Sequence, residues 1–233
     1  MNAKSRSLSG AVLMLLIIPI FAGLLACMPV PIGDPERSKI DPELTGIWVT
    51  IKDSESLDEP GFYVFEPYDK RTWLVAGAGL VAGDNPDLPD FDLTAYEGWV
   101  ELAAADPVVQ GYVSIEDMVV YKAWLKKLGG EVFMTWEPKL LLDEGIPEPE
   151  VWFTFHVVKK GRDRIELRYV DGNSDLFDDV DETRRAYERV ISKNANNPEL
   201  YAEEDDADVV LVRVQETELE LFEELLDIIV NWN

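Results

Sequence analysis

The chain has 233 residues, of which 47% are hydrophobic and 10% aromatic, enough to bury one core of the larger all-β kind. Its 46 acidic residues outnumber its 21 lysines and arginines, so the formal net charge is −25. A field of that sign repels polyanions, and we therefore expect no nucleic-acid partner.

Residues 1–26 have the composition of an export signal. Lys4 and Arg6 lie in the first ten residues, and an apolar run follows from Ala11 to Leu25. A run of that length is short for a membrane span and suits the core of a cleavable signal peptide. A plain signal peptide or an uncleaved anchor is the alternative to the more specific interpretation that follows.

The apolar run ends in Leu24-Leu25-Ala26-Cys27, which resembles the lipobox of bacterial lipoproteins. The resemblance implies cleavage before Cys27, lipid on that cysteine, and a membrane as the first partner. Met28 stands where an aspartate would favour the inner membrane, so the resemblance suggests the outer membrane of a bacterial envelope. Cys27 is also the only cysteine of the chain and has no intramolecular disulfide partner.

Residues 27–44 contain four prolines and many charges, so we expect a lipidated tether that forms no packed element. Residues 45–233 are then one domain. Short runs rich in β-branched and aromatic residues, bounded by Gly, Pro or Asp, predict strands. They lie at 45–51, 61–66, 72–76, 98–103, 118–125, 132–136, 151–158, 165–170 and 208–215.

Hairpin turns are predicted at Gly129-Gly130 and at 160–163, which indicates an antiparallel sheet in a barrel or sandwich. Two segments have helical spacing instead. Residues 181–194 place Tyr187, Val190 and Ile191 on one face, and residues 216–229 carry one apolar stripe.

Gly46-Ile47-Trp48 opens the first predicted strand, and Arg213 lies in the last one. This pattern resembles that of the lipocalins (calycins), and the order of elements is similar to that of a group of small bacterial lipoproteins. The resemblance implies a mainly β, antiparallel barrel whose floor is formed by Gly46, Trp48 and Arg213. One helix would precede the last strand and a C-terminal helix would follow it. An open α+β antiparallel sheet is the alternative.

Catalytic motifs are not evident. The only histidine, His156, has no second histidine or free thiol to complete a nucleophilic or zinc site. We therefore expect no enzyme and no cofactor, although a hydrolase that uses two carboxylates stays open.

A calcium-loop spacing starts at Asp171 and continues through Asn173 and Asp175 to Glu182. Leu176 occupies the position that requires glycine, and a strand precedes the loop where a helix is usual. This pattern therefore favours a solvated loop over a metal site.

Five tryptophans lie in predicted strands and are candidates to line a ligand cavity: Trp73, Trp99, Trp124, Trp136 and Trp152. They can equally be core residues.

The sequence leaves two candidate functions for the protein. One is a lipid-anchored barrel that binds a small apolar ligand. The other is a structural or interaction lipoprotein with a filled core, which binds an envelope protein through its loops or its C-terminal helix.

Overall fold

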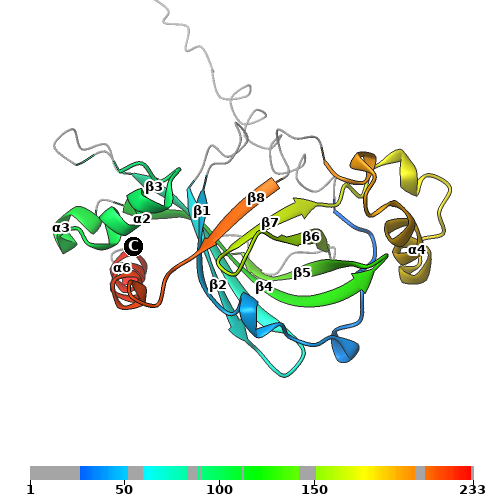
Figure 1. Cartoon of the computed structure of the whole chain (residues 1–233), viewed down its shortest axis with the longest axis horizontal. Coiled ribbons are helices and arrows are strands. Elements are labelled where there is room, and N and C mark those ends of the chain that lie inside the picture. Colours follow the sequence, from blue (N-terminus) through cyan, green and yellow to red (C-terminus); the bar gives the residue numbers. More distant parts are fainter. Residues whose placement is uncertain are drawn as a thin grey trace, which may run out of the picture.

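The computed structural model describes residues 27–51, 60–82, 89, 91–111, 113–141, 151–202 and 208–231. Eight antiparallel strands close into a barrel in sequence order (Figure 1). They are β1 (Gly46–Ile51), β2 (Gly61–Pro67), β3 (Trp73–Ala82), β4 (Val113–Leu128), β5 (Glu131–Leu141), β6 (Phe153–Lys159), β7 (Arg164–Tyr169) and β8 (Asp208–Arg213). Pairing of β8 with β1 closes the barrel, which confirms the predicted fold over an open sheet.

Both predicted hairpins are present. Gly129 and Gly130 join β4 to β5 with φ angles of 62° and 100°, in the left-handed region that glycine reaches at no steric cost. Gly161 has a φ of 121° in the turn between β6 and β7. We call the barrel end where β1 begins and β8 ends the floor. The opposite end, where β6 begins and β7 ends, is the mouth.

Strand alternation gives the barrel two buried faces. One residue set from all eight strands forms the interior cluster, which includes Trp48, Phe65, Trp73, Met134 and Trp136. The alternate residues point outward and are covered by helices or by the N-terminal segment. In β1, four consecutive residues from Ile47 to Thr50 are buried, because both faces of that strand are covered.

The described part of the chain has four α-helices, and all of them lie outside the barrel wall. They are α2 (Tyr96–Ala103), α3 (Pro107–Gln110), α4 (Arg184–Asn194) and α6 (Leu219–Asn231). Figure 1 shows α2, α3 and α6 grouped on one side of the barrel and α4 on the other. The predicted helix before the last strand is α4, capped by the Thr183 side chain, and the predicted C-terminal helix is α6. None of the helices in the described ranges is both long and apolar enough to cross a membrane.

The prediction of a strand at 98–103 is wrong, because these residues belong to α2. A short apolar run does not distinguish a strand from a buried helix. Trp99 and Leu102 both face the outer barrel wall, where the Trp99 Nε1 donates a hydrogen bond to the Thr50 carbonyl at 2.9 Å. Gly98 permits the close approach of the preceding loop, since a Cβ there would lie 2.0 Å from the Asp92 carbonyl oxygen.

The expectation that residues 28–44 form no packed element is also wrong. Met28, Ile32 and Leu44 are at most 1% exposed, and the Met28 N–H donates to the Trp152 carbonyl at 2.9 Å. The prolines start two short 3₁₀ turns, η1 (Pro35–Arg37) and η2 (Pro42–Leu44). Proline is tolerated there because the first N–H of a helical turn has no partner within the turn. The segment therefore lies along the barrel from its mouth to its floor.

Candidate functional site

The floor of the barrel is formed around Trp48. Its side chain is fully buried, and its Nε1 donates to the Leu44 carbonyl at 2.9 Å. The Arg213 guanidinium lies 4.7 Å from the centre of the Trp48 ring, within the range of a cation–π interaction. The Arg213 Nε is also 4.0 Å from an Asp163 carboxylate oxygen. Gly46 has a φ of 128°, which accounts for the glycine in this motif.

Above the floor, aromatic rings in mutual contact line the middle of the barrel. Trp136 lies at the centre of this column. Its ring centroid is 5.9 Å from that of Phe65, 5.4 Å from Tyr63, 5.0 Å from Tyr121 and 4.9 Å from Phe155. Such tilted and edge-on contacts are the favoured geometry of aromatic pairs. The column gives the interior an apolar surface with a few polar tips.

Burial changes along this column. Toward the floor, the side chains of Trp48, Phe65, Trp73 and Trp136 are buried. Toward the mouth, the interior-facing rings are only partly buried: Tyr63, Tyr121, Phe153, Phe155 and Tyr169. The interior side chains are therefore enclosed most tightly near the floor and less tightly toward the mouth.

Two indole N–H groups and two phenols are among the polar groups of the interior. In the described part of the chain, the buried indole N–H groups of Trp73 and Trp136 have no acceptor. Burial raises the pKa of Tyr63 and Tyr121, so both phenols keep their proton. A buried donor without an acceptor is costly, so this arrangement suits a guest that brings an acceptor oxygen.

Cys27 lies at the mouth. The Tyr169 hydroxyl, on the interior face of β7, donates a hydrogen bond to the Cys27 sulfur. The cysteine is partly buried, and this burial raises the pKa of its thiol. Tyr169 in turn contacts Phe155, with ring centroids 5.4 Å apart, so the sulfur stands at the start of the aromatic column.

Of the five predicted lining tryptophans, Trp73 and Trp136 face the interior. The prediction is wrong for Trp99, Trp124 and Trp152, which lie outside. Trp99 is in α2. Trp124 points outward because its neighbour Ala123 points inward, and its Nε1 donates to the Ile32 carbonyl at 2.7 Å.

Trp152 pairs with Met28 and packs in the outer cluster beneath α4. Sequence reasoning missed the interior tyrosines Tyr63, Tyr121 and Tyr169. Their signal is alternation: Tyr63 lies two residues before the interior Phe65, and Tyr169 two residues after the interior Leu167.

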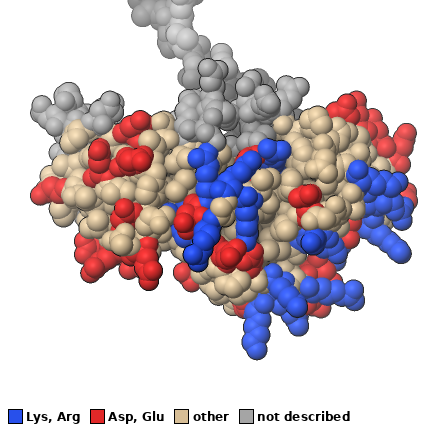
Figure 2. All heavy atoms as spheres, in the orientation of Figure 1, with Lys and Arg blue, Asp and Glu red and all other residues tan. Residues whose placement is uncertain are grey.

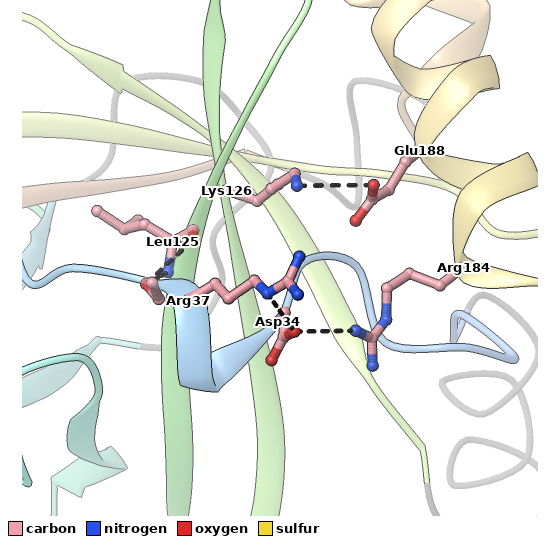
Figure 3. A pocket seen from close by; sticks show the side chains of 7 residues that line it. Asp34, Arg37, Leu125, Lys126, Arg184 and Glu188 are labelled. Atoms are coloured by element: carbon pink, nitrogen blue, oxygen red, sulfur yellow. Dashed lines mark hydrogen bonds and ion pairs between the residues drawn. The ribbon is translucent and has the colours of Figure 1, made fainter.

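A polar cluster holds the N-terminal segment on the barrel wall (Figure 3). We call Gly33, Asp34, Lys126, Arg184 and Glu188 the latch. The Gly33 N–H donates to a Glu188 carboxylate oxygen at 3.0 Å, and Lys126 lies 3.7 Å from the other oxygen. Asp34 is 3.9 Å from the Arg184 guanidinium. The latch joins the segment to both β4 and α4 around a small polar pocket of about 190 Å³.

Next to the latch, Ser38 forms two hydrogen bonds to the backbone of β4. Its hydroxyl donates to the Leu125 carbonyl and accepts from the Leu125 N–H, both at 3.0 Å. The Ser38 hydroxyl thus pairs with both backbone groups of Leu125, as a residue of a neighbouring strand would do. Cys27 is thus attached to a segment with fixed contacts at both ends and in the middle.

A second concave surface lies outside the barrel, between α6 and the first two strands. This acidic groove has a volume of about 480 Å³. It is lined by Gly46, Ile47, Val64, Glu66, Leu219, Glu223, Leu226 and Asp227. Figure 2 shows acidic side chains gathered over the lobe that carries α6, lysines and arginines over the barrel, and both kinds on the α4 side. The groove combines an apolar floor with carboxylates at its rim.

His156 lies on the outer wall of the barrel, where it packs against neighbouring rings. Its ring is stacked between Phe133 and Tyr201, with centroids 5.0 and 5.7 Å away. Nδ1 is 3.0 Å from the Tyr201 hydroxyl, and Nε2 is 3.4 Å from a Glu131 carboxylate oxygen. Burial lowers the pKa of His156, so the ring is neutral near pH 7.

The calcium-loop residues do not come together. The Asp171 carboxylate accepts a hydrogen bond from the Asn173 N–H at 2.9 Å, and the Ser174 hydroxyl accepts one from the Leu176 N–H. These are the bonds of local turns. In the described ranges, which include all four candidates, no three acidic, histidine or cysteine residues are placed to hold a metal ion.

Comparison of the chain with protein-family models, with curated proteins and with solved structures returned no match.

Proposed function

We propose that this protein is a lipid-anchored lipoprotein of the bacterial cell envelope whose barrel binds a small apolar ligand. The observation that carries the proposal is the ring-lined interior of the closed barrel, which is buried at the floor and partly exposed at the mouth. An eight-stranded barrel is wide enough to hold one such ligand. The N–H of Trp136, which has no acceptor among the described residues, favours a ligand that has an oxygen acceptor within an apolar body.

The ligand is tested by native mass spectrometry. The mature chain, residues 27–233 with Cys27→Ser, is exported behind an ordinary cleavable signal, purified, and compared before and after extraction with organic solvent. We expect a near-stoichiometric lipid or hydrophobic metabolite. An apo mass, together with no binding of added apolar ligands, would contradict the proposal.

The anchor is tested separately in the full-length precursor. Wild-type protein should sediment with membranes and label with radioactive palmitate, because thioether-linked acyl chains attach it almost irreversibly. Cys27→Ser should lose the label and appear in the soluble fraction. Retention of Cys27→Ser on membranes would refute lipid attachment as the anchor. Separation of inner and outer membranes then tests the outer-membrane location.

The acidic groove favours a second candidate function, the binding of an envelope protein. Its apolar floor and acidic rim match a basic segment that also carries aliphatic side chains. Glu223→Lys should then abolish capture of the partner by crosslinking in intact cells. Glu224→Lys is the matched control, because it makes the same charge change on an exposed position of α6 that does not line the groove. Equal capture by both variants would refute a partner in the groove.

A further inference from the structure

We infer that the barrel mouth receives one fatty acyl chain of the lipid that Cys27 itself carries. The inference rests on the proposed lipid attachment and on an interior that binds apolar ligands. The occupant of the barrel interior would then be an acyl chain attached covalently to the same protein molecule. The remaining acyl chains of the lipid would stay in the membrane and hold the protein there.

Cys27 does not stand at the end of a free spacer. Met28 pairs with Trp152 at the start of β6, and the Gly33 N–H is bonded to Glu188 on α4. The Leu44 carbonyl then accepts the Trp48 indole at the floor. With residues 28–44 fixed in this way, the sulfur stays at the barrel mouth.

The sulfur of Cys27 lies beside an interior residue of the barrel. Its hydrogen-bond donor is Tyr169, which follows Leu167 on the interior face of β7. The Tyr169 ring contacts both Phe153 and Phe155, at 6.3 and 5.4 Å between centroids. A glyceryl group bonded to this sulfur therefore starts beside interior rings and not on the outer wall.

The interior presents both apolar surface and a hydrogen-bond donor to such a group. The mouth-side rings are partly exposed and present apolar surface, which suits a hydrocarbon chain. Deeper in, Trp136 is 3% exposed and its N–H has no acceptor within the described residues. The diacylglyceryl group carries ester carbonyls, which are acceptors of the kind this donor lacks. The site thus has an independent feature besides the cysteine that indicates an acyl ligand.

The exchange is also reasonable energetically. A chain that moves from the bilayer into the barrel leaves one apolar environment for another, so little hydrophobic free energy is gained or lost. Two acyl chains are enough for stable membrane attachment. A lipoprotein with three chains can therefore place one in its own barrel and remain anchored.

The test compares binding of cis-parinaric acid to three forms of the protein in identical phospholipid nanodisc suspensions. The forms are the lipidated wild type, soluble Cys27→Ser, and a lipidated variant with a flexible Gly/Ser spacer between Cys27 and Met28. Energy transfer from tryptophan reports probe bound inside the barrel. We expect about one equivalent bound to Cys27→Ser, at least tenfold weaker binding to the wild type, and restored binding in the spacer variant.

Each other result has a distinct meaning. If the wild type binds the probe as well as Cys27→Ser does, self-occupancy is refuted while the ligand-binding proposal stands. If none of the three forms binds it, the proposed apolar-ligand function fails, and the inference fails with it. If the spacer variant stays blocked, the position of Cys27 does not cause the block and the inference is overturned.

A crosslinking experiment separates the protein's own lipid from free membrane lipid. Cells are fed a fatty acid with a photoreactive diazirine, illuminated, and the lipoprotein is digested. Self-occupancy predicts an intramolecular crosslink between the lipidated peptide and peptides from β6 or β7. Crosslinks from these strands to free phospholipid only, with none to the Cys27 lipid, would overturn it.

Discussion

Removal of the Trp48 side chain is the most direct test of the floor. Trp48→Ala deletes a fully buried indole, a hydrogen bond to the Leu44 carbonyl and the ring under Arg213. Truncation of a buried tryptophan typically costs about 3–5 kcal/mol of unfolding free energy. The cation–π contact supplies about 0.5–2 kcal/mol of such a loss and the hydrogen bond about 1 kcal/mol, with lost packing supplying the rest.

The measurement is urea unfolding of the soluble Cys27→Ser protein, followed by far-UV circular dichroism because the mutation removes a fluorophore. A double-mutant cycle with Trp48→Leu and Arg213→Met isolates the coupling of the two side chains. We expect a coupling of about 0.5–2 kcal/mol. A loss below about 1 kcal/mol for Trp48→Ala, or no coupling in the cycle, would refute the role of Trp48 and Arg213 as the floor.

Three further outcomes are expected. Glu188→Gln weakens the latch, so hydrogen exchange of the amide of Gly33 and its neighbours should speed up while the barrel strands stay protected; unchanged exchange would contradict the latch. Gly129→Ala should destabilise more than Gly130→Ala, because both have positive φ but only a Cβ at Gly129 would clash with an α4 carbonyl, at 2.5 Å; equal losses would contradict that contact. The folded-state pKa of His156 is lowered below 6.5. The neutral His156 ring therefore contributes its full share to the free energy of unfolding above pH 6.5. This share is lost as the pH falls toward the folded pKa, by at most about 1.4 kcal/mol per pH unit. His156→Gln should flatten the dependence of the unfolding free energy on pH, as measured by urea unfolding at several pH values.

The local pattern of the sequence was sufficient for the strands and their antiparallel pairing, whereas the closed barrel was implied only by the resemblance to lipocalins. All eight strands overlap a short apolar run that was predicted as a strand. Such runs can be recognised because period-two alternation and glycine turns are local properties of the sequence. The same holds for α4 and α6, whose apolar residues repeat at helical spacing. The pairing of Trp48 with Arg213 was implied by the resemblance to lipocalins and not by a local pattern, and in the structure the guanidinium lies 4.7 Å from the centre of the ring.

Which face of each strand points inward was decided only by the tertiary structure. Alternation defines two faces, but here both are buried, one by the interior and one by helices or the N-terminal segment, so hydrophobicity does not tell them apart. Trp124 and Trp136 look equivalent in sequence, yet one lies under Ile32 and the other in the aromatic column. The place of Cys27 at the mouth likewise depends on contacts between residues far apart in the chain, such as Gly33 with Glu188, which no local pattern encodes.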